Sequence, residues 1–285
     1  MATRFGISKL VVGLTVVAIG TSAPEFAVSG YAAYKGAGEM ALANVVGSNI
    51  FNLGFILALC AIILPLSVTK PTVYRDVPVL LLGSALLAFF ALWDGQVQRW
   101  EGTLLLVGLL SYILYLIQQA RRDKSQLSDV PEVEEETGST GYALLILLGG
   151  LVALLLGCNL MVNTAEIFAK TMGFSEWFIG ITVIAIGTSL PELVTALSSV
   201  LKKDADIGVG GLVGSDIFNI LGVIGVSAVI NPMAVSDSSR VPFYFLLFAT
   251  TLTWGMLRRG WRLSRLDGLA LLVIATARYG FEIFS

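Results

Sequence analysis

The chain has 285 residues, of which 56% are hydrophobic and only 13% are charged, and its mean hydropathy is +0.84. A soluble domain carries about 25% charged residues, so this composition excludes a soluble protein, and the length allows roughly eight to ten membrane helices of about 20 residues each. The net charge of −2 argues against nucleic-acid binding, and the absence of histidine excludes imidazole metal sites and histidine-based catalysis.

Nine apolar runs between charged or Pro/Gly breaks are predicted to span the membrane. In chain order they cover residues 8–34, 39–65, 73–93, 101–120, 142–169, 175–200, 206–231, 241–257 and 265–284. With the amino terminus inside, Lys and Arg divide thirteen to five between the inner and outer faces. This bias agrees with the positive-inside rule and places the carboxy terminus outside.

The longest polar stretch, residues 121–141, separates the fourth and fifth predicted spans. It begins with the basic run RRDK and continues with four glutamates between residues 132 and 136. A run of this kind favours a solvated cytoplasmic linker over a regulatory calcium site. We therefore expect two halves, residues 1–120 and 142–285, joined by an acidic linker.

The two halves contain an internal repeat. Residues 13–68 align without a gap with residues 180–235, at an offset of 167, and about 21 of the 56 positions are identical. The identities gather in two blocks, TVVAIGTSAPE (15–25) against TVIAIGTSLPE (182–192) and VVGSNIFN (45–52) against LVGSDIFN (212–219). Five predicted spans separate the two starts, so the copies enter the membrane from opposite faces. The fold expected is an all-α polytopic membrane protein with inverted-topology repeats of about five helices, which is typical of secondary transporters.

Glu25 and Glu192 occupy equivalent places inside apolar spans. An ionised carboxylate at that depth costs at least a few kcal/mol, and the sequence offers no Lys, Arg or His close to either residue. The compensating partner is therefore expected to be a bound cation or a proton.

Each glutamate follows a glycine and a proline, in the segments 20–25 and 187–192. Proline cannot donate a hydrogen bond to the carbonyl four residues back, so it breaks the helix and frees main-chain carbonyls. In lipid such groups are tolerated only where they line a cavity or meet an ion. A simple proline kink with Ser and Thr hydroxyls bonded to the helix is the alternative, but its repetition beside a buried glutamate favours a cation site.

The second block adds neutral oxygens, from Ser48 and Asn52 in one copy and Ser215 and Asn219 in the other. Serine and asparagine four residues apart share one helix face, whereas the glycine before each serine is expected to permit close helix packing. All of these ligands are oxygen atoms, which select hard cations such as calcium, sodium or magnesium. Two glutamates neutralise one divalent or two monovalent ions, which provides a physical basis for exchange.

The motifs GTSAPE, GTSLPE, GSNIFN and GSDIFN resemble those of the sodium/calcium exchanger family, within the cation/calcium antiporter superfamily. The resemblance covers most of the chain and implies a ten-helix fold that exchanges sodium for calcium by alternating access. It implies that calcium is held by Glu25, Glu192 and the carbonyls of Thr21 and Thr188. It further implies that sodium is held by those glutamates, by Ser22, Ser48, Ser189 and Ser215, and by the carbonyls of Ala18 and Ala185, with Asn52 and Asn219 lining the central position.

Two departures from the family pattern stand out. Family members have a helix before the first motif, but Met1 aligns with Phe168, so the counterpart of the 142–169 helix is missing from the sequence. We expect a shortened gene model rather than an incomplete transporter. Potassium-dependent relatives carry Asp where this chain has Asn219, which argues against potassium transport. The acid lies instead at Asp216, which is an additional candidate ligand or a polar contact at the edge of the cavity.

The functional hypothesis is thus a calcium/sodium antiporter in a prokaryotic plasma membrane, with calcium and sodium ions as substrates and the lipid bilayer as its environment. A proton/calcium antiporter is the alternative, although that related family has an asparagine-containing version of the first motif. A membrane-embedded hydrolase using the paired acids and a channel fit the sequence less well. We expect no enzyme activity, no cofactor apart from the transported ions and no nucleic-acid partner, and the sequence indicates no protein partner.

Overall fold

The computed structural model describes residues 18–124, 171–202 and 205–284, together with isolated positions between 149 and 168. The first part of the predicted 8–34 span, most of the 142–169 span and the linker beyond residue 124 lie outside the described residues. Within the described ranges every long element is a helix, and the strands are only two residues each. The all-α class is therefore confirmed.

The first copy of the repeat consists of helices interrupted by short irregular turns. In chain order it comprises α2 (Ala18–Thr21), α3 (Ala23–Lys35), α4 (Gly38–Phe51), the π-helix η3 (Asn52–Ile56), α5 (Leu57–Ile63), β1 (Leu66–Ser67), the π-helix η4 (Thr72–Asp76), α6 (Val77–Trp93), β2 (Gln96–Val97) and α7 (Arg99–Lys124). The last helix continues to Lys124, so the first residues of the predicted linker are helical.

The second copy repeats this order. It comprises α9 (Glu176–Ile179), the π-helix η5 (Gly180–Ile184), α10 (Ala185–Thr188), α11 (Leu190–Leu201), α12 (Ala205–Phe218), the π-helix η6 (Asn219–Val223), α13 (Ile224–Ile230), β3 (Met233–Ala234), the 3-10 helix η7 (Asp237–Ser239), α14 (Arg240–Arg258), β4 (Arg262–Leu263) and α15 (Arg265–Phe284). The bounds of α4, η3 and α5 recur 167 residues later as those of α12, η6 and α13.

A proline ends the central helix of each copy. Leu64 precedes Pro65 with φ −141° and ψ 126°, and Asn231 precedes Pro232 with φ −149° and ψ 128°. The residue before proline is driven out of the helical region by a clash with the proline ring. The chain therefore leaves each helix in an extended conformation, and the short strands β1 and β3 follow at once.

The short strands pair between the copies and fix their relative direction. β1 pairs antiparallel with β4, with Leu66 opposite Leu263, and β2 pairs antiparallel with β3, with Gln96 opposite Ala234. The first ladder precedes the membrane-length helix η4–α6 and the second follows it, so they lie at opposite ends of that helix. β1 and its equivalent β3 therefore lie on opposite faces, which confirms the inverted topology.

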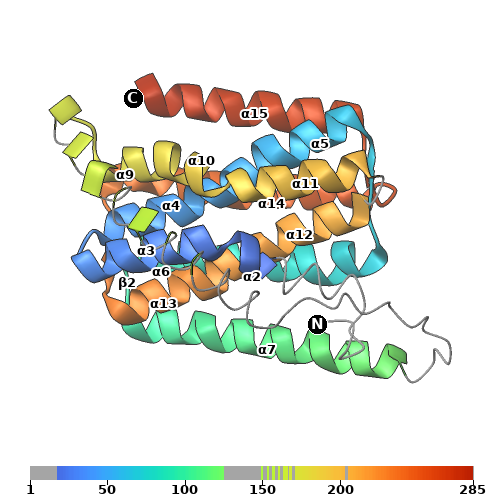
Figure 1. The fold of residues 1–285 in the computed structure, drawn as a ribbon, viewed down its shortest axis with the longest axis horizontal. Coiled ribbons are helices and arrows are strands. Elements are labelled where there is room, and N and C mark those ends of the chain that lie inside the picture. Colours follow the sequence, from blue (N-terminus) through green and yellow to red (C-terminus); the bar gives the residue numbers. More distant parts are fainter. Residues whose placement is uncertain are drawn as a thin grey trace.

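The helices also pack between the two copies in equivalent ways. α5 packs against α15, and its equivalent α13 packs against α7. α4 packs against η5 and α10, and its equivalent α12 packs against α2. Figure 1 shows the equivalent helices α7 and α15 along opposite edges of the bundle, with the broken helices and α4 between them. The two blocks shared by the copies of the repeat are thus brought to the middle of the molecule.

Four helices of the described ranges are long and apolar enough to cross a membrane, namely Gly38–Ile63, Thr72–Trp93, Arg99–Gln119 and Gly208–Ile230. The pair Glu176–Thr188 and Leu190–Leu201, bent by 43° at a short break, makes a fifth candidate. α14 and α15 are helices at the predicted places but fall below the same combination of length, hydropathy and low charge. The predicted number of nine spans is therefore not confirmed.

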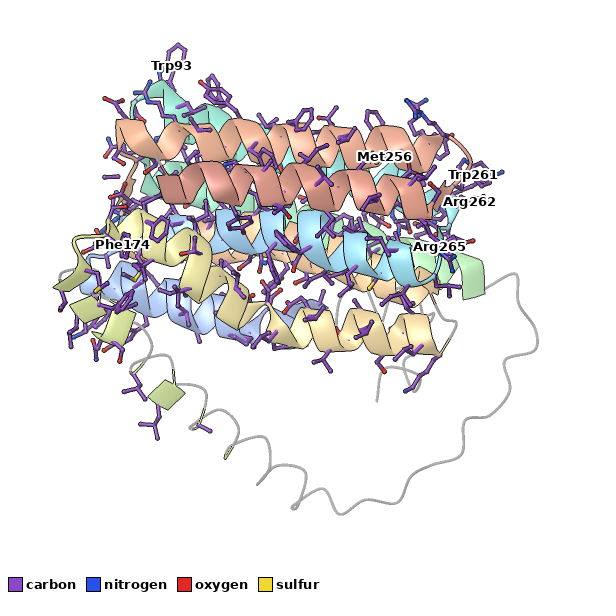
Figure 2. The ribbon with its side chains drawn as sticks, turned by 90° about the horizontal axis from the view of Figure 1, so that it is seen from above. Trp93, Phe174, Met256, Trp261, Arg262 and Arg265 are labelled. Atoms are coloured by element: carbon purple, nitrogen blue, oxygen red, sulfur yellow. The ribbon has the colours of Figure 1, made fainter. Side chains whose placement is uncertain are left out.

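Aromatic and basic residues mark the two ends of the bundle. Figure 2 shows Trp93 and Phe174 at one end and Trp261, Arg262 and Arg265 at the other. The second end also carries the Lys70 ammonium 4.5 Å from the ring centroid of Trp261. Tryptophan beside cationic side chains is typical of a membrane–water interface, and all of the basic residues named here belong to the predicted inner face.

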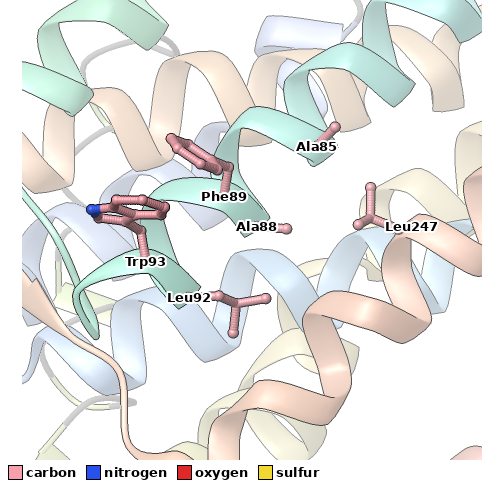
Figure 3. Close-up of a pocket in the computed structure, with 6 residues that line it drawn as sticks. All are labelled: Ala85, Ala88, Phe89, Leu92, Trp93 and Leu247. Atoms are coloured by element: carbon pink, nitrogen blue, oxygen red, sulfur yellow. The ribbon is translucent and has the colours of Figure 1, made fainter.

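A hollow of about 320 Å³ lies between α6 and α14 (Figure 3). It is lined by apolar side chains, including Phe89, Trp93 and Leu247, and the two aromatic residues are 55% and 78% exposed. Apolar exposure of this kind fits contact with lipid tails. None of the described residues that line the hollow offers a side-chain oxygen, so we do not take it as a candidate ion site.

Candidate cation-binding site

Two broken helices form the frame of the site. α2 ends at Thr21 and α3 begins at Ala23, and Ser22 between them has φ −78° and ψ 3°. In the second copy Ser189 has φ −82° and ψ 4° between α10 and α11. A proline occupies the first turn of the helix that follows each break, where its missing N–H costs little. The breaks predicted from the sequence therefore occur in both copies.

The two glutamates lie in the first turns that follow these breaks. Glu25 is fully buried and Glu192 is 2% exposed. A helix N-terminus favours negative charge, but that effect is too small by itself to offset burial of a carboxylate. Among the described residues neither glutamate has an ion-pair partner, and the Oε2 atom of each accepts no hydrogen bond.

Hydroxyl groups join the glutamates to the opposite copy. Ser189 Oγ donates to Glu25 Oε1 at 3.4 Å, so a serine of the second copy contacts the first glutamate. Ser215 Oγ donates to Glu192 Oε1 at 2.8 Å and lies 2.5 Å from Ser22 Oγ. These contacts bring residues of both copies, separated by up to 193 positions in the chain, into one cluster.

Ser48 and Thr188 complete this cluster. Their hydroxyl oxygens are 3.4 Å apart, and both side chains are buried. Two predicted hydroxyl ligands, Ser22 and Ser215, are therefore in contact across the interface between the repeats, and Ser48 contacts the side chain of Thr188, which was predicted as a ligand through its carbonyl.

The amides form a second cluster around Asp216. Asn52 Nδ2 donates to Asp216 Oδ1 at 2.8 Å, and Asn49 Nδ2 donates to the backbone carbonyl of Asp216 at 3.1 Å. Asn219 Nδ2 donates to Asn49 Oδ1 at 3.2 Å. Asp216 is fully buried, and its Oδ2 atom accepts no hydrogen bond from the described residues.

Asn52 and Asn219 each begin a π-helix, η3 and η6. Single π-helical turns inside α-helices are frequent at functional sites, because they change the direction in which the neighbouring side chains point. The Oδ1 atoms of both asparagines are buried without a hydrogen-bond donor in the described part of the chain.

The backbone carbonyls predicted as ligands are already hydrogen-bond acceptors. The carbonyl of Ala18 accepts from Ser22 N at 2.9 Å and from Thr21 Oγ1 at 3.3 Å. The carbonyl of Ala185 accepts from Ser189 N and Thr188 Oγ1 at 3.1 and 3.3 Å. A cation held by these carbonyls must therefore share them with, or displace, these donors. Their ligand roles, and those of the Thr21 and Thr188 carbonyls, stay predictions.

Within the part of the chain that the structure describes, five buried acceptor oxygens of the site have no hydrogen-bond donor. These atoms are Glu25 Oε2, Glu192 Oε2, Asn52 Oδ1, Asn219 Oδ1 and Asp216 Oδ2. Buried polar atoms are nearly always paired, and a buried unpaired carboxylate is especially costly. Oxygen acceptors of this kind fit a hard cation. No cluster of three or more His, Cys, Asp or Glu able to hold a metal occurs among the described residues, so neutral oxygens must contribute.

Three buried polar residues were missed by the sequence reasoning: Ser29, Asn44 and Asn49. Asn49 bridges Asp216 and Asn219, and Asn44 contacts both Ser29 and Thr188. The aligned residues of the second copy, Ala196, Gly211 and Asp216, differ in each case. A search for shared residues therefore passes over these positions, although three polar residues within otherwise apolar helices were a usable signal.

Comparisons with known proteins identify the family of the chain. The sequence profile of the sodium/calcium exchanger protein family matches residues 1–118 and 142–277. The chain belongs to this family. It is 35% identical to the putative antiporter CaxA of Alkalimonas amylolytica, an alignment that covers 100% of this chain and 91% of CaxA. It is also 35% identical to the inner membrane protein YrbG of Escherichia coli strain K12, over 98% of this chain and 86% of YrbG.

A solved structure supports the fold directly. The sodium-calcium exchanger NCX_Mj, soaked with Na⁺ and Sr²⁺, matches with a TM-score of 0.74 at 29% identity, covering 98% of this chain and 89% of that chain. The exchanger-family protein described here is therefore a cation/calcium antiporter of the membrane, a transporter and not an enzyme.

Proposed function

We propose that this exchanger-family protein couples calcium transport to an opposing flux of sodium, with the ions bound between the two repeats near the middle of the membrane. The observation that carries the proposal is the set of five buried, donor-free oxygens contributed by both copies. Glu25 and Glu192 supply two negative charges, which balance one calcium ion or two sodium ions. Either load lowers the cost of keeping these charges in a low-dielectric interior.

The ligand set proposed for calcium consists of Glu25, Glu192 and the carbonyls of Thr21 and Thr188. The set proposed for sodium adds the hydroxyls of Ser22, Ser48, Ser189 and Ser215 and the carbonyls of Ala18 and Ala185. Asn52 and Asn219 would line the space between them, beside Asp216. No cofactor is needed, because the transported ions themselves supply the missing charge.

Inverted repeats provide the means of exchange. At the site the copies also meet through hydroxyl and amide hydrogen bonds. Such contacts can be exchanged when one repeat rocks against the other, so that the site opens to each face in turn. A location in a prokaryotic plasma membrane follows from the same family relationship and is part of this proposal.

The test is calcium uptake by proteoliposomes. Vesicles loaded with sodium and diluted into sodium-free buffer should accumulate calcium at least about tenfold faster than vesicles loaded with choline, because sodium leaving down its gradient drives the exchange. Vesicles carrying the Glu25→Gln variant provide the background rate. Uptake that ignores sodium but follows an imposed pH gradient would instead support proton/calcium exchange and contradict the proposal.

A further inference from the structure

A cavity of about 20 Å³ lies beside Glu192, between α11 and α12. Among the described residues, its polar lining comes from Thr21, Glu192, Thr195 and Ser199, and Gly211 forms part of its wall. A space of this size holds about one water molecule, which occupies roughly 10–15 Å³ by a comparable measure. The carboxylate of Glu192 is buried, and its Oε2 atom has no hydrogen-bond partner among the described residues.

The hydroxyl oxygens that line this cavity remain able to accept hydrogen bonds or to coordinate a cation. Thr195 Oγ1 donates to the backbone carbonyls of Pro191 and Glu192, both at 3.0 Å, and Ser199 Oγ donates to the carbonyl of Thr195 at 2.9 Å. Each hydroxyl proton is therefore donated to a backbone carbonyl of α11. The oxygen lone pairs stay available for water or a cation.

The equivalent place in the first copy is filled. At the offset of 167, Gly211 corresponds to Asn44 and Ala196 to Ser29. Asn44 Nδ2 donates to Ser29 Oγ at 2.9 Å, and Thr188 Oγ1 donates to Asn44 Oδ1 at 3.1 Å. Asn44 and Ser29 are fully buried. We call Ser29, Asn44 and Thr188 the asparagine plug.

Gly211 supplies no side chain to fill the space that Asn44 occupies in the first copy. A Cβ atom added at Gly211 would meet no atom within 4 Å, so the backbone has room for a side chain that the sequence does not supply. The two halves of the site therefore repeat their glutamates, threonines and serines but differ in the layer of residues behind them. The Glu25 half is closed by hydrogen-bonded side chains, and the Glu192 half contains a water-sized space.

We propose that the cavity beside Glu192 is a water and cation site through which ions enter and leave in this conformation, and that the asparagine plug keeps the Glu25 half closed. A cation at Glu192 retains a water ligand in the cavity and meets the oxygens of Thr195 and Ser199. It therefore loses less hydration than a cation at Glu25. The inference rests on the proposed function, since it requires that cations bind at Glu192.

The experiment measures thiol reactivity at equivalent buried positions. In a background with Cys60→Ala and Cys158→Ala, the variants Ala196→Cys and Ser29→Cys place a thiol beside the cavity and within the plug, respectively. A cationic methanethiosulfonate reagent should modify the Ala196→Cys protein at least about tenfold faster than the Ser29→Cys protein, because modification requires an open path to the thiol. Calcium should slow the faster reaction.

Transplanting the plug provides the decisive variants. Gly211→Asn, added to Ala196→Cys, should reduce its reaction rate to that of Ser29→Cys, and Asn44→Gly, added to Ser29→Cys, should raise the slower rate. Glu192→Gln should remove the preference of the cavity thiol for the cationic reagent over neutral methyl methanethiosulfonate, because the attraction is coulombic. Equal rates for the two single thiols, or no effect of Gly211→Asn, would overturn the proposal.

Calcium binding by titration calorimetry separates this inference from the proposed function. Calcium binding by the unsubstituted protein together with equal thiol rates contradicts the inference alone, whereas a protein that binds neither calcium nor sodium contradicts the proposed function. If Gly211→Asn does not elute as a monodisperse protein, the same measurement is made on Gly211→Ser, which has a smaller side chain. An unchanged rate of thiol modification in Gly211→Ser would equally overturn the inference.

Discussion

At the scale of single residues, the distinguishing feature of the site is a set of buried oxygen atoms without a cationic partner or hydrogen-bond donor among the described residues. Glu25, Glu192 and Asp216 place three carboxylates in the interior, and none has a Lys or Arg partner within the described ranges. The hydroxyl and amide donors around them satisfy one oxygen of each carboxylate. The remaining oxygens require a positive charge that the described side chains do not supply.

Replacing either glutamate by glutamine tests this account at the residue level. Glu25→Gln and Glu192→Gln keep the side-chain volume but remove one charge and introduce N–H groups where an acceptor is needed. We expect calcium affinity to fall by at least about a hundredfold, that is about 2.7 kcal/mol, as measured by titration calorimetry on the purified protein. Glu39→Gln is the control, because that carboxylate lies outside the site and binds Ser236 and Ser239. Near-normal affinity in either site variant would contradict the assignment.

Asp216 is expected to act differently from the glutamates. Its Oδ1 atom already accepts from Asn52, and its equivalent in the first copy is Asn49, a neutral residue. Asp216→Asn should therefore weaken calcium binding by about tenfold or less, since one neighbouring charge is lost but the paired glutamates remain. The same calorimetric titration checks this. A loss as complete as that caused by Glu25→Gln would make Asp216 a principal ligand.

Some contacts between single residues of the two copies could not be predicted from the sequence. The serines that make contacts across the repeats, Ser22, Ser48, Ser189 and Ser215, were all candidates, whereas Thr188 was a candidate through its carbonyl only. Their pairing, such as Ser22 with Ser215, joins positions 193 residues apart and depends on how the copies dock. Asn44 was passed over because the second copy has glycine at the equivalent position.

At the scale of elements, proline is the strongest local determinant. Pro24 and Pro191 predict breaks that the structure places at Ser22 and Ser189. The π-helical turns at Asn52 and Asn219 were not predicted, because no residue type imposes an extra residue in a helical turn and packing selects it instead. Local chemistry thus fixes where a helix must stop, whereas the finer course of a helix is set by its neighbours.

Gly47 is required where α4 crosses the broken helix of the second copy. A Cβ atom at Gly47 would lie 2.6 Å from the carbonyl oxygen of Ile181 and 2.7 Å from Ala185 Cβ. Gly47→Ala should therefore force the helices apart, with a cost of about 1–3 kcal/mol, and should lower both the apparent melting temperature and the transport rate.

Gly30→Ala is the matched control for this change. A Cβ atom at Gly30, in α3, meets nothing within 4 Å, and alanine favours a helix over glycine by about 1 kcal/mol. This variant should be as stable as the wild type or more so in the same thermal assay. An unchanged melting temperature for Gly47→Ala would show that the close helix contact is not needed.

At the scale of the whole molecule, duplication explains most of what the sequence could predict. A gapless alignment with an odd number of intervening spans was enough to predict inverted repeats. The pairing of β1 with β4 and of β2 with β3 was not predictable, because two-residue strands carry no periodic pattern. The number of membrane spans also could not be fixed, since α14 and α15 contain charged residues within lengths barely sufficient to cross a bilayer.

The orientation of the molecule is open to a direct test. The loop that follows α6 and the loop that follows α14 are at opposite ends of the bundle, near Trp93 and Trp261 (Figure 2). In a background without native cysteines, Trp93→Cys should react with a membrane-impermeant maleimide added outside intact cells. Arg259→Cys should react only after the membrane is opened, because basic loops stay inside. Labelling of both from the same side would contradict the predicted topology.

The central claim is that one calcium ion is shared by the paired glutamates of the two copies. Anomalous diffraction at long wavelength from crystals grown with calcium tests it most directly. We expect one anomalous peak between the carboxylates, with oxygen atoms of both Glu25 and Glu192 at about 2.3–2.6 Å, the range for calcium ligands. The account would be contradicted if the two carboxylates did not approach a common peak. It would equally be contradicted by a peak that lacks either glutamate as a ligand.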